Sequence, residues 1–325
     1  MNDRYMEALV QYNMTVDNVR KGRSGWICET SMGIVLLKEY RGTLKRLEFE
    51  TQVLGQVSQD GLVQVDNYIP TAQKELISLG EDGTRYVLKH WFTDRECNLK
   101  DEKEIVQAVT QIARLHKSFQ KIPKAKEWTM GSIVMDSLEK EMERHNLELK
   151  RARNYIKNKR KKTEFERCMM GNYSMFYEQA AEACEGMGHL NLADKKRGQF
   201  LCHGNLDHHH VLIGDSYVAV IEFNKMHLGS QMADLYHFMR KVMEKQEWNQ
   251  KLGQEMLSAY DRVLPLEAED RACLYYLFLY PEKYWKQVNF YYNARKSWIP
   301  ERNMEKIRTL ESQMEGKKKF LAILQ

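Results

Sequence analysis

The chain has 325 residues, 43% of them hydrophobic and 10% aromatic, and its charges nearly cancel to a formal net charge of +5. This composition can build a large core and excludes a globally disordered chain. So small a net charge does not indicate a nucleic-acid-binding protein, and no apolar run is long enough to span a bilayer. The length predicts two domains, or one large unit with two lobes.

The six cysteines are scattered along the chain and form no C-x-x-C pair. This spacing favours reduced thiols that pack as small hydrophobic residues, as in proteins of a reducing compartment. The first eleven residues carry three charges and lack the apolar segment of a signal peptide. We therefore expect synthesis and retention in the cytoplasm, or assembly from inside the cell onto another structure.

The first ninety residues predict a small β-sheet with one helix. Two apolar runs, Trp26–Thr30 and Gly33–Lys38, flank a two-residue turn and predict a hairpin. Residues 44–54 carry apolar side chains at helical spacing, which predicts a helix. Shorter strands are expected in three further apolar segments, at 64–68, 76–79 and 86–88.

After Asp94 the spacing of apolar residues becomes helical. A strong helical pattern covers 105–116, and another covers 165–183. From Asp234 to the end of the chain the pattern is helical again. The second part of the chain is therefore expected to be mainly α-helical.

One strand pattern interrupts this helical part. The runs 211–213 and 217–221 are apolar and are joined by Gly-Asp-Ser, which predicts a hairpin. A β-rich first part followed by a helical part with one embedded hairpin predicts an α+β, protein-kinase-like fold of two lobes. We place the β-rich, nucleotide-type lobe at 1–92 and the helical lobe, with the catalytic-type loop, at 93–325.

A basic segment, Leu149–Lys162, holds eight of the fifty Lys and Arg residues. Its charges do not alternate in sign, so the segment could bind phosphate groups or a partner. The alternative is the solvated side of a helix whose other side, with Tyr155 and Ile156, is buried. Sequence alone leaves both alternatives open.

A polar loop between two strands carries the most informative pattern. The segment Gln199–Ile213, QFLCHGNLDHHHVLI, enters and leaves through apolar runs around the loop His203–His210. Eleven residues after Val211, Glu222 opens a second polar loop behind the next strand. A loop, a hairpin and a second loop bring two sets of polar side chains to one end of the hairpin. Kinase-type phosphotransferases place their nucleophile-orienting acid and their metal ligands there.

This segment resembles the H-G-D-x-x-x-x-N loop, with its following D-F-D or D-F-E element, of aminoglycoside and choline kinase-like phosphotransferases. The resemblance places Asn205 at the catalytic aspartate and His210 at the metal-binding asparagine. Glu222 falls at the metal-binding aspartate of the second loop. Asp234 matches an aspartate that braces the catalytic loop in that family.

The N-terminal part agrees with this resemblance. Lys38 matches the lysine that contacts nucleotide phosphates, and Glu50 falls where its ion-pair partner is expected, with Glu48 as the competing choice. Residues 89–92 would form the hinge, whose backbone bonds the nucleotide base. The resemblance therefore implies ATP as the cofactor, bound through Lys38 and Glu50.

The chain also resembles the spore coat protein S family over nearly its whole length. The likeness is clearest in the Pro-Glu-Lys-Tyr-Trp-Lys element at 281–286 and in the run 289–299. Members of that family have a kinase-like fold and are associated with the coat of bacterial endospores. The resemblance implies a location in the spore coat and coat proteins as partners, with no nucleic acid expected.

Three replaced side chains argue against phosphate transfer. Asn205 could orient an attacking hydroxyl but is not a base at physiological pH. His210 offers nitrogen where Mg²⁺ prefers oxygen, and Glu222 keeps the charge but is longer by one methylene. We therefore expect an impaired, kinase-like protein with a structural or interaction role, and the replacements argue against bound Mg²⁺.

The alternative is an active ATP-dependent phosphotransferase that acts on a small molecule. It would retain Lys38, Glu50 and Asp234 and would use Asp207, two residues after Asn205, as a displaced base. Thermal stabilisation by ATP with Mg²⁺ or Mn²⁺ would favour this alternative.

The histidines of the loop suggest one more kind of site. His203 and the run 208–210 could bind a transition metal such as Zn²⁺. Three consecutive residues cannot all point one way, however, and no Cys or Glu at helical spacing completes a set. For His203 the simpler expectation is a packed, hydrogen-bonded structural residue.

Overall fold

The computed structural model describes residues 4–92, 95–192, 195, 198–293 and 301–325. Residues 294–299, part of one of the family-like runs, lie outside these described residues. The lobe boundary expected at residue 92 stays a prediction. Packing groups the chain into two compact units: the first comprises Met1–Met130 and His203–Met226, and the second comprises Gly131–Cys202 and His227–Gln325.

The first unit is built on a six-stranded sheet in which every strand pairing is antiparallel. Its order is β1-β2-β3-β7-β5, and β6 pairs with β7. The hairpin expected at residues 26–38 is confirmed, because Thr30 lies opposite Gly33 and Gly33 takes the positive φ that the tight turn requires. The strands are β1 Val16–Lys21, β2 Trp26–Thr30, β3 Gly33–Glu39, β5 Tyr68–Ile69, β6 Ser78–Leu79 and β7 Arg85–His90.

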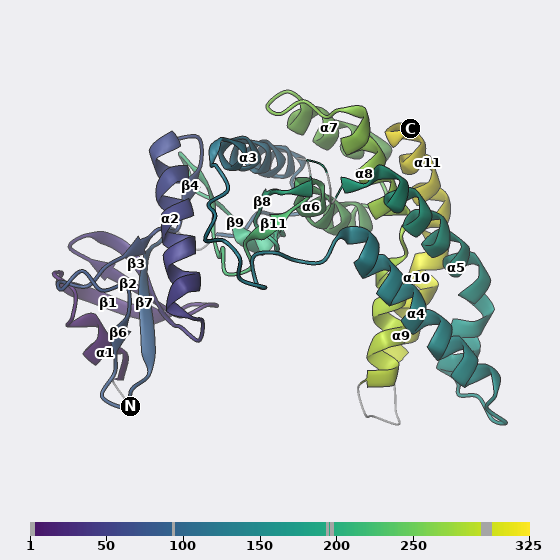
Figure 1. Cartoon of the computed structure of the whole chain (residues 1–325), viewed down its shortest axis with the longest axis horizontal. Helices are drawn as coiled ribbons and strands as arrows, with labels where there is room; N and C mark the ends of the chain where they lie inside the picture. The colour runs from purple at the N-terminus through teal and green to yellow at the C-terminus, as the bar shows by residue number, and fades with distance from the viewer. Residues whose placement is uncertain (1–3, 93–94, 193–194, 196–197, 294–300) are drawn as a thin grey trace. The chain divides into compact units, whose positions relative to one another are not determined.

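Helix α2, Leu44–Asp60, runs alongside this sheet (Figure 1). It begins where the Thr43 side chain accepts the N–H of Arg46, and it ends at Gly61 in the left-handed conformation. The helix expected at 44–54 is confirmed and continues for six more residues. The unit also contains α1, Arg4–Leu9, and α3, Glu102–Lys121.

A second sheet of the first unit joins segments that are far apart in sequence. Strand β10, Val218–Val220, pairs antiparallel with β9, Val211–Ile213, and parallel with β4, Gln64–Val65. The hairpin expected at 211–221 is confirmed. The single strand expected at 64–68 is wrong, because a turn at Asn67 separates β4 from β5 and the two short strands belong to different sheets.

Two apolar clusters pack the N-terminal sheet of the first unit on its two faces, among the residues that the structure describes. One packs α1 and the chain just after it against strands β2, β3 and β7. The other lies on the opposite strand faces and combines side chains from the N-terminal sheet with side chains of the β9–β10 hairpin. Its buried members are Ile27, Leu36, Trp91, Leu212, Ala219 and Ile221.

The second unit is mainly helical and has one two-stranded sheet, in which β8 and β11 are antiparallel. With the antiparallel sheet of the N-terminal part, it confirms the predicted α+β class. Its strands are β8 Phe200–Cys202 and β11 His227–Gly229. Its helices are α4 Leu138–Lys157, α5 Glu164–Leu190, α6 Gln231–Lys245, α7 Gln250–Asp261, α8 Ala268–Leu279, α9 Glu282–Asn293, α10 Glu301–Ser312 and α11 Met314–Leu324.

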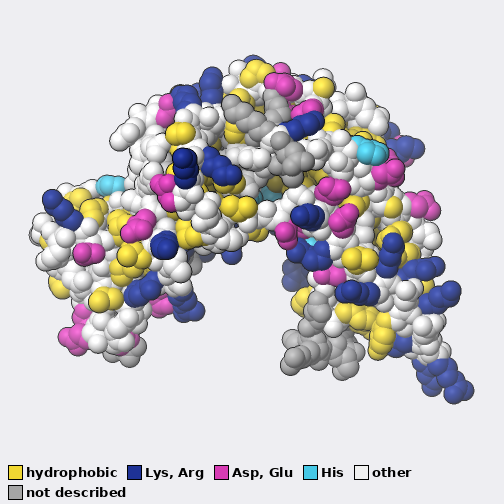
Figure 2. Space-filling view, in the orientation of Figure 1, with side chains coloured by type: hydrophobic (Ala, Val, Ile, Leu, Met, Phe, Trp, Pro, Cys, Tyr) yellow, Lys and Arg dark blue, Asp and Glu magenta, His cyan; other side chains and the backbone are white. Residues whose placement is uncertain are grey.

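The basic segment 149–162 forms the end of α4 and the turn into α5. Leu149 and Ile156 are fully buried, whereas Tyr155 is exposed, against expectation. Figure 2 shows Lys and Arg side chains gathered at this end of the α4–α5 pair. The segment is therefore an amphipathic helix end with a solvated basic side. None of the described helices has the length and apolar character needed to cross a membrane.

Packing between α5 and α8 leaves no room for a side chain at Gly186. A Cβ atom there would lie 2.1 Å from the ring of Tyr276. We expect Gly186→Ala to lower the free energy of unfolding by about 1–3 kcal/mol, because the half-buried ring has to shift from its packed position. Urea unfolding followed by circular dichroism measures the change.

Gly171→Ala on the same helix is the matched control, since a Cβ atom there would meet no atom within 4 Å. Alanine is the better helix former, so this variant should gain up to about 1 kcal/mol. Equal effects of the two substitutions would contradict the packing described for α5 and α8.

Candidate active site

Lys38 lies near the end of β3, and its ammonium group contacts Oε2 of Glu222. The two residues are 184 positions apart in sequence. The Lys38 side chain is 26% exposed and that of Glu222 only 9%, so the carboxylate is largely removed from water. Burial alone would raise the pKa of Glu222, but the positive charges of Lys38 and Lys89 outweigh it and hold this pKa below its ordinary value.

The backbone at Glu222 is also unusual. Its φ is +69°, a left-handed conformation that non-glycine residues rarely adopt. Its N–H group donates a hydrogen bond of 3.0 Å to Oδ2 of Asp66. Such conformations persist where surrounding contacts fix them, and they cluster at functional sites. Here the contacts are the Asp66 hydrogen bond and the Lys38 ion pair.

Asp66 follows β4 and is completely buried. Its Oδ2 lies 2.5 Å from the ammonium group of Lys89, which is itself only 3% exposed. Burial, reinforced by the nearby Glu222 charge, raises the pKa of Asp66 despite the Lys89 partner. The hinge expected at residues 89–92 stays a prediction, but its first residue, Lys89, is closed off from solvent. Lys89 is a strand residue of β7 whose charge is buried against Asp66.

The expected ion pair between Lys38 and Glu50 is wrong. Glu50 is 1% exposed on α2, where its Oε1 accepts from Arg46 at 2.6 Å and its Oε2 accepts from the Tyr68 hydroxyl at 2.5 Å. Lys38 contacts Glu222 instead. A role for Lys38 and Glu50 in binding a nucleotide stays a prediction.

Asn205 and His210 contact each other in the polar loop. His210 belongs to a short 3₁₀ turn, His208–His210, and its Nδ1 lies 2.9 Å from Oδ1 of Asp207. With an ionised carboxylate at this atom, Nδ1 carries the proton and Nε2 accepts from the Asn205 amide at 3.3 Å. Burial would raise the pKa of Asp207, yet the hydrogen bonds and charges of its histidine neighbours hold it well below its ordinary value.

His203 is a structural residue, as expected. It is completely buried, and its Nε2 lies 2.9 Å from the carbonyl oxygen of Ile221. Its ring also packs against Phe223, with 4.7 Å between centroids. Asp234 is buried in the first turn of α6 in the second unit, and its bracing role stays a prediction.

A small cavity of about 110 Å³ lies beside the Lys38–Glu222 pair. Ligand pockets commonly have volumes of about 300–1,000 Å³, so this cavity is too small for a nucleotide. The cavity is lined by Arg23, Ser24, Ile27, Leu36, Trp91, Glu96, His209, His210, Ile221 and Glu222.

At the expected hinge, the backbone N–H of Trp91 is engaged within the protein, because it donates to the carbonyl of Ile34 at 2.9 Å.

Three charged or polar side chains tie the β1–β2 loop down beside this cavity. Arg23, in that loop, lies 2.9 Å from Oε1 of Glu96. Glu96 Oε2 lies 2.5 Å from Nδ1 of His209. We call Arg23, Glu96 and His209 the loop clasp. A larger cavity of about 570 Å³ elsewhere in the first unit contains none of the predicted site residues.

Sequence reasoning missed several residues of this site. Asp66 and Lys89 gave no motif signal, although a charged residue next to an apolar strand run can indicate a buried pair. Arg23 lies between Gly22 and Gly25, a spacing typical of a tight loop between strands. The contact of Glu96 with His209 has no local signal, because the two residues lie 113 positions apart in sequence.

Comparison with protein families identifies the chain. Residues 8–324 match the family described as "Spore coat putative kinase YutH", so the chain belongs to this family. The predicted relation to spore coat proteins with a kinase-like fold is thereby confirmed. A comparison with curated protein sequences finds no match.

Solved structures confirm the kinase-like fold. The chain is similar to an aminoglycoside phosphotransferase from Alicyclobacillus acidocaldarius, with a TM-score of 0.85 and 15% identity over 98% of this chain and 94% of that chain. It is similar to amicoumacin kinase hAmiN in complex with AMP-PNP, Ca²⁺ and Ami, with a TM-score of 0.61, 13% identity and coverage of 97% and 92%. It is also similar to a microcompartment-associated aminopropanol kinase, with a TM-score of 0.60 and 14% identity over 98% of this chain and 97% of that chain. Identities this low show the fold alone.

The Lys38–Glu222 pair gives a test by stability. Replacing Lys38 by Met leaves the Glu222 carboxylate buried without its counter-charge. We expect the free energy of unfolding to fall by about 2–3 kcal/mol at pH 7, somewhat less than for a fully buried pair. Lys45→Met, at an exposed position of α2, is the control and should change stability by less than about 0.5 kcal/mol.

The same pair predicts the pH dependence of this difference. Because the pKa of Glu222 is lowered in the folded chain, the pair stabilises the fold above the ordinary glutamate pKa of about 4.3. This contribution is lost as the pH falls through the lowered pKa. Denaturant unfolding at several pH values should show that the difference in free energy of unfolding between wild type and Lys38→Met becomes smaller below about pH 4.3. A difference that does not change with pH would count against the ion pair.

Proposed function

We propose that this member of the spore coat kinase family is an impaired kinase-like protein, located in the spore coat, with a structural or interaction role. The observation that carries the proposal is that the side chains expected at the catalytic positions contact other side chains of the protein. Asn205 and His210 are bonded to each other, and Glu222 is bonded to Lys38. Groups that would act on a substrate are thus engaged with one another.

The base position supports the proposal first. The Asn205 amide cannot take a proton from a hydroxyl, and it donates its own hydrogen to His210. General-base assistance is commonly worth a factor of about 10²–10⁴ in rate. Positioning and charge stabilisation dominate phosphoryl transfer, so this loss alone would leave residual turnover.

The metal positions support it more strongly. Both ring nitrogens of His210 are used, one by Asp207 and one by Asn205. The charge of Glu222 is compensated by Lys38. Mg²⁺ requires oxygen ligands in near-octahedral geometry. His210 offers only nitrogen, and the Lys38 ammonium occupies Oε2 of Glu222, which leaves Oε1 as the one carboxylate oxygen of the pair without a hydrogen-bond partner. Without the metal, the charge of a transferring phosphoryl group is not neutralised.

The nucleotide position is consistent with the same proposal. Lys38, the expected phosphate contact, is held by Glu222, and the cavity beside it measures about 110 Å³. A fold relative was solved with AMP-PNP, which makes a nucleotide such as ATP the ligand class to test for this chain. Binding would require the loop clasp to open and Lys38 to leave Glu222.

A second candidate function is ATP-dependent phosphorylation of a small molecule. The observation that favours it is the carboxylate of Asp207, which its neighbours keep ionised in the same loop. The hydrogen bonds that lower its pKa also make it a weak base and direct it toward His209 and His210. Asp207 is therefore better explained as the cap of the 3₁₀ turn.

Incubation of the purified chain with ATP and Mg²⁺ tests the proposal. We expect no transfer of the γ-phosphate to water, to the chain itself or to a panel of aminoglycosides and amino alcohols. We also expect no thermal stabilisation by ATP with Mg²⁺ or Mn²⁺. Transfer by the wild type that is lost in Asn205→Ala or Asp207→Asn would overturn the proposal and support the second candidate.

The coat role has its own test in spores. An Asn205→Ala variant should reach the coat fraction of purified spores in the same amount as the wild-type chain, because the role does not need catalysis. Quantitative immunoblotting of coat extracts measures this. Loss of the variant from the coat, although it folds normally, would contradict a role independent of the loop.

A further inference from the structure

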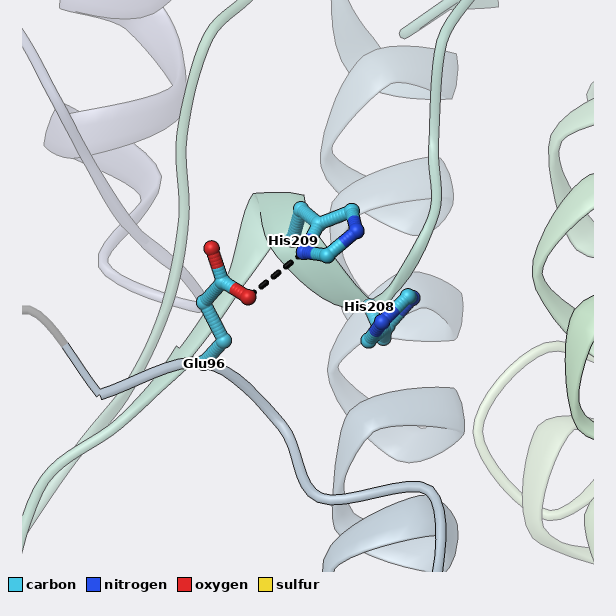
Figure 3. Close-up of side chains that lie close together, drawn as sticks. All are labelled: Glu96, His208 and His209. Carbon is cyan, nitrogen blue, oxygen red and sulfur yellow. Dashed lines mark hydrogen bonds and ion pairs between the residues drawn. The ribbon is translucent and has the colours of Figure 1, made fainter. Parts of the chain in front are cut away.

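A group of metal-type ligands lies beside the loop just described. Glu96, His208 and His209 each offer one ligand atom, and these three atoms all lie within 4.8 Å of one another. Figure 3 shows the Glu96 carboxylate facing the ring of His209, with the ring of His208 next to them. All three residues are half-buried, so the group is neither a fully solvated charge cluster nor sealed from solvent.

Backbone hydrogen bonds hold the main chain of these three residues in place. Glu96 forms an isolated antiparallel bridge with Leu212 on β9, and the N–H of Cys97 donates to the carbonyl of Val211 at 2.9 Å. The two histidines belong to the 3₁₀ turn that runs directly into β9. Asp207 caps this turn by accepting the N–H of His209 at 3.0 Å. Glu96 and the histidine pair are thus held on adjoining backbone segments.

We infer that Glu96, His208 and His209 form a binding site for a divalent transition-metal ion. Ligand atoms about 2.1 Å from one ion are at most about 4.2 Å apart. All three separations between the ligand atoms are 4.8 Å or less, so rotation of the half-buried side chains has to shorten any of them by at most about 0.6 Å to reach this limit. Three protein ligands leave at least one position on the ion for water.

The donor set selects the kind of ion. Two imidazole nitrogens and one carboxylate suit Zn²⁺, Co²⁺, Ni²⁺ or Fe²⁺. Mg²⁺ and Ca²⁺ prefer sets made of oxygen atoms, so they should compete poorly. The site therefore differs in its ligands and in its chemistry from the Mg²⁺ positions at His210 and Glu222, although Glu96 and His209 line the same small cavity as those two residues.

The Glu96 carboxylate can bind an ion through Oε2 while Oε1 keeps its ion pair with Arg23. Arg23 occupies Oε1, while Oε2 faces Nδ1 of His209. An ion would take the place of the proton between Oε2 and the imidazole, and a neutral ring would then carry this proton on Nε2. Arg23 is 60% exposed and can stay on Oε1, which would connect the β1–β2 loop to the bound ion.

The fold supplies the ligand that the sequence lacked. The histidine run has no Cys or Glu at helical spacing, but Glu96 reaches it from 113 residues before His209. The inference does not rest on the proposed function, because none of the three ligands is Asn205, His210 or Glu222. Metal binding and phosphate transfer can therefore be tested separately.

Cobalt titration of the whole chain, purified without a histidine tag and treated with EDTA, tests the site. We expect visible d–d absorption that saturates at one Co²⁺ per chain, disappears on addition of Zn²⁺ and is unaffected by excess Mg²⁺. Glu96→Gln and His208→Ala should each weaken Co²⁺ binding by about 100-fold or more, since each removes a direct ligand. His189→Ala, at an exposed position of α5, is the matched control and should bind as the wild type does.

Three results would overturn the inference. They are the absence of Co²⁺ and Zn²⁺ binding, binding that is unchanged in Glu96→Gln and His208→Ala, and an equal loss of binding in His189→Ala. Circular dichroism in EDTA checks that each variant is folded. If His208→Ala does not fold, the nearly isosteric Glu96→Gln decides the question.

Discussion

Four buried or half-buried charges hold the first unit together at its centre. Two carboxylate residues, Asp66 and Glu222, lie next to each other between two ammonium groups, Lys38 on Glu222 and Lys89 on Asp66. Charges removed from water are costly unless they are paired and hydrogen-bonded, so each group of this network depends on the others. Because the four residues come from β3, from the β4–β5 turn, from β7 and from the loop after β10, the network also joins the two sheets.

This network is the physical basis of the proposal that the kinase-like fold is kept while phosphoryl transfer is lost. In a working site, the lysine of β3 and the carboxylate of the second loop must be available to phosphate and metal. Here Lys38 and Glu222 satisfy each other, and the left-handed backbone at Glu222 is fixed by Asp66. Residues that stabilise the fold are therefore the same residues that would otherwise bind the nucleotide complex.

Local patterns predicted the secondary structure of the first unit well where apolar residues alternate or repeat at helical spacing. The β2–β3 hairpin and helix α2 were found in this way. Strand β1 was not predicted, because it is an edge strand with four of its six side chains exposed and its sequence shows no clear alternation of apolar and polar residues. The resemblance to kinases placed Lys38 and Glu222 at one site, but the pairing of these side chains across 184 residues has no local signal.

The same limit applies to Glu50 and Glu96. Glu50 lies at the family position for a partner of Lys38, yet its carboxylate accepts hydrogen bonds from Arg46 on the same helix and from Tyr68. Glu96 gains its histidine neighbours only through the bridge to β9. Sequence patterns identify which residue types can act, whereas long-range contacts decide which of them meet.

Crystals of the chain grown with Mn²⁺ and AMP-PNP would test the central claim most directly. An anomalous difference map locates Mn²⁺ without assumptions about its ligands. We expect no Mn²⁺ between His210 and Glu222, with the Lys38 ammonium still on Glu222. An Mn²⁺ peak about 2.2 Å from a Glu222 oxygen, with Lys38 moved onto a phosphate, would contradict the account.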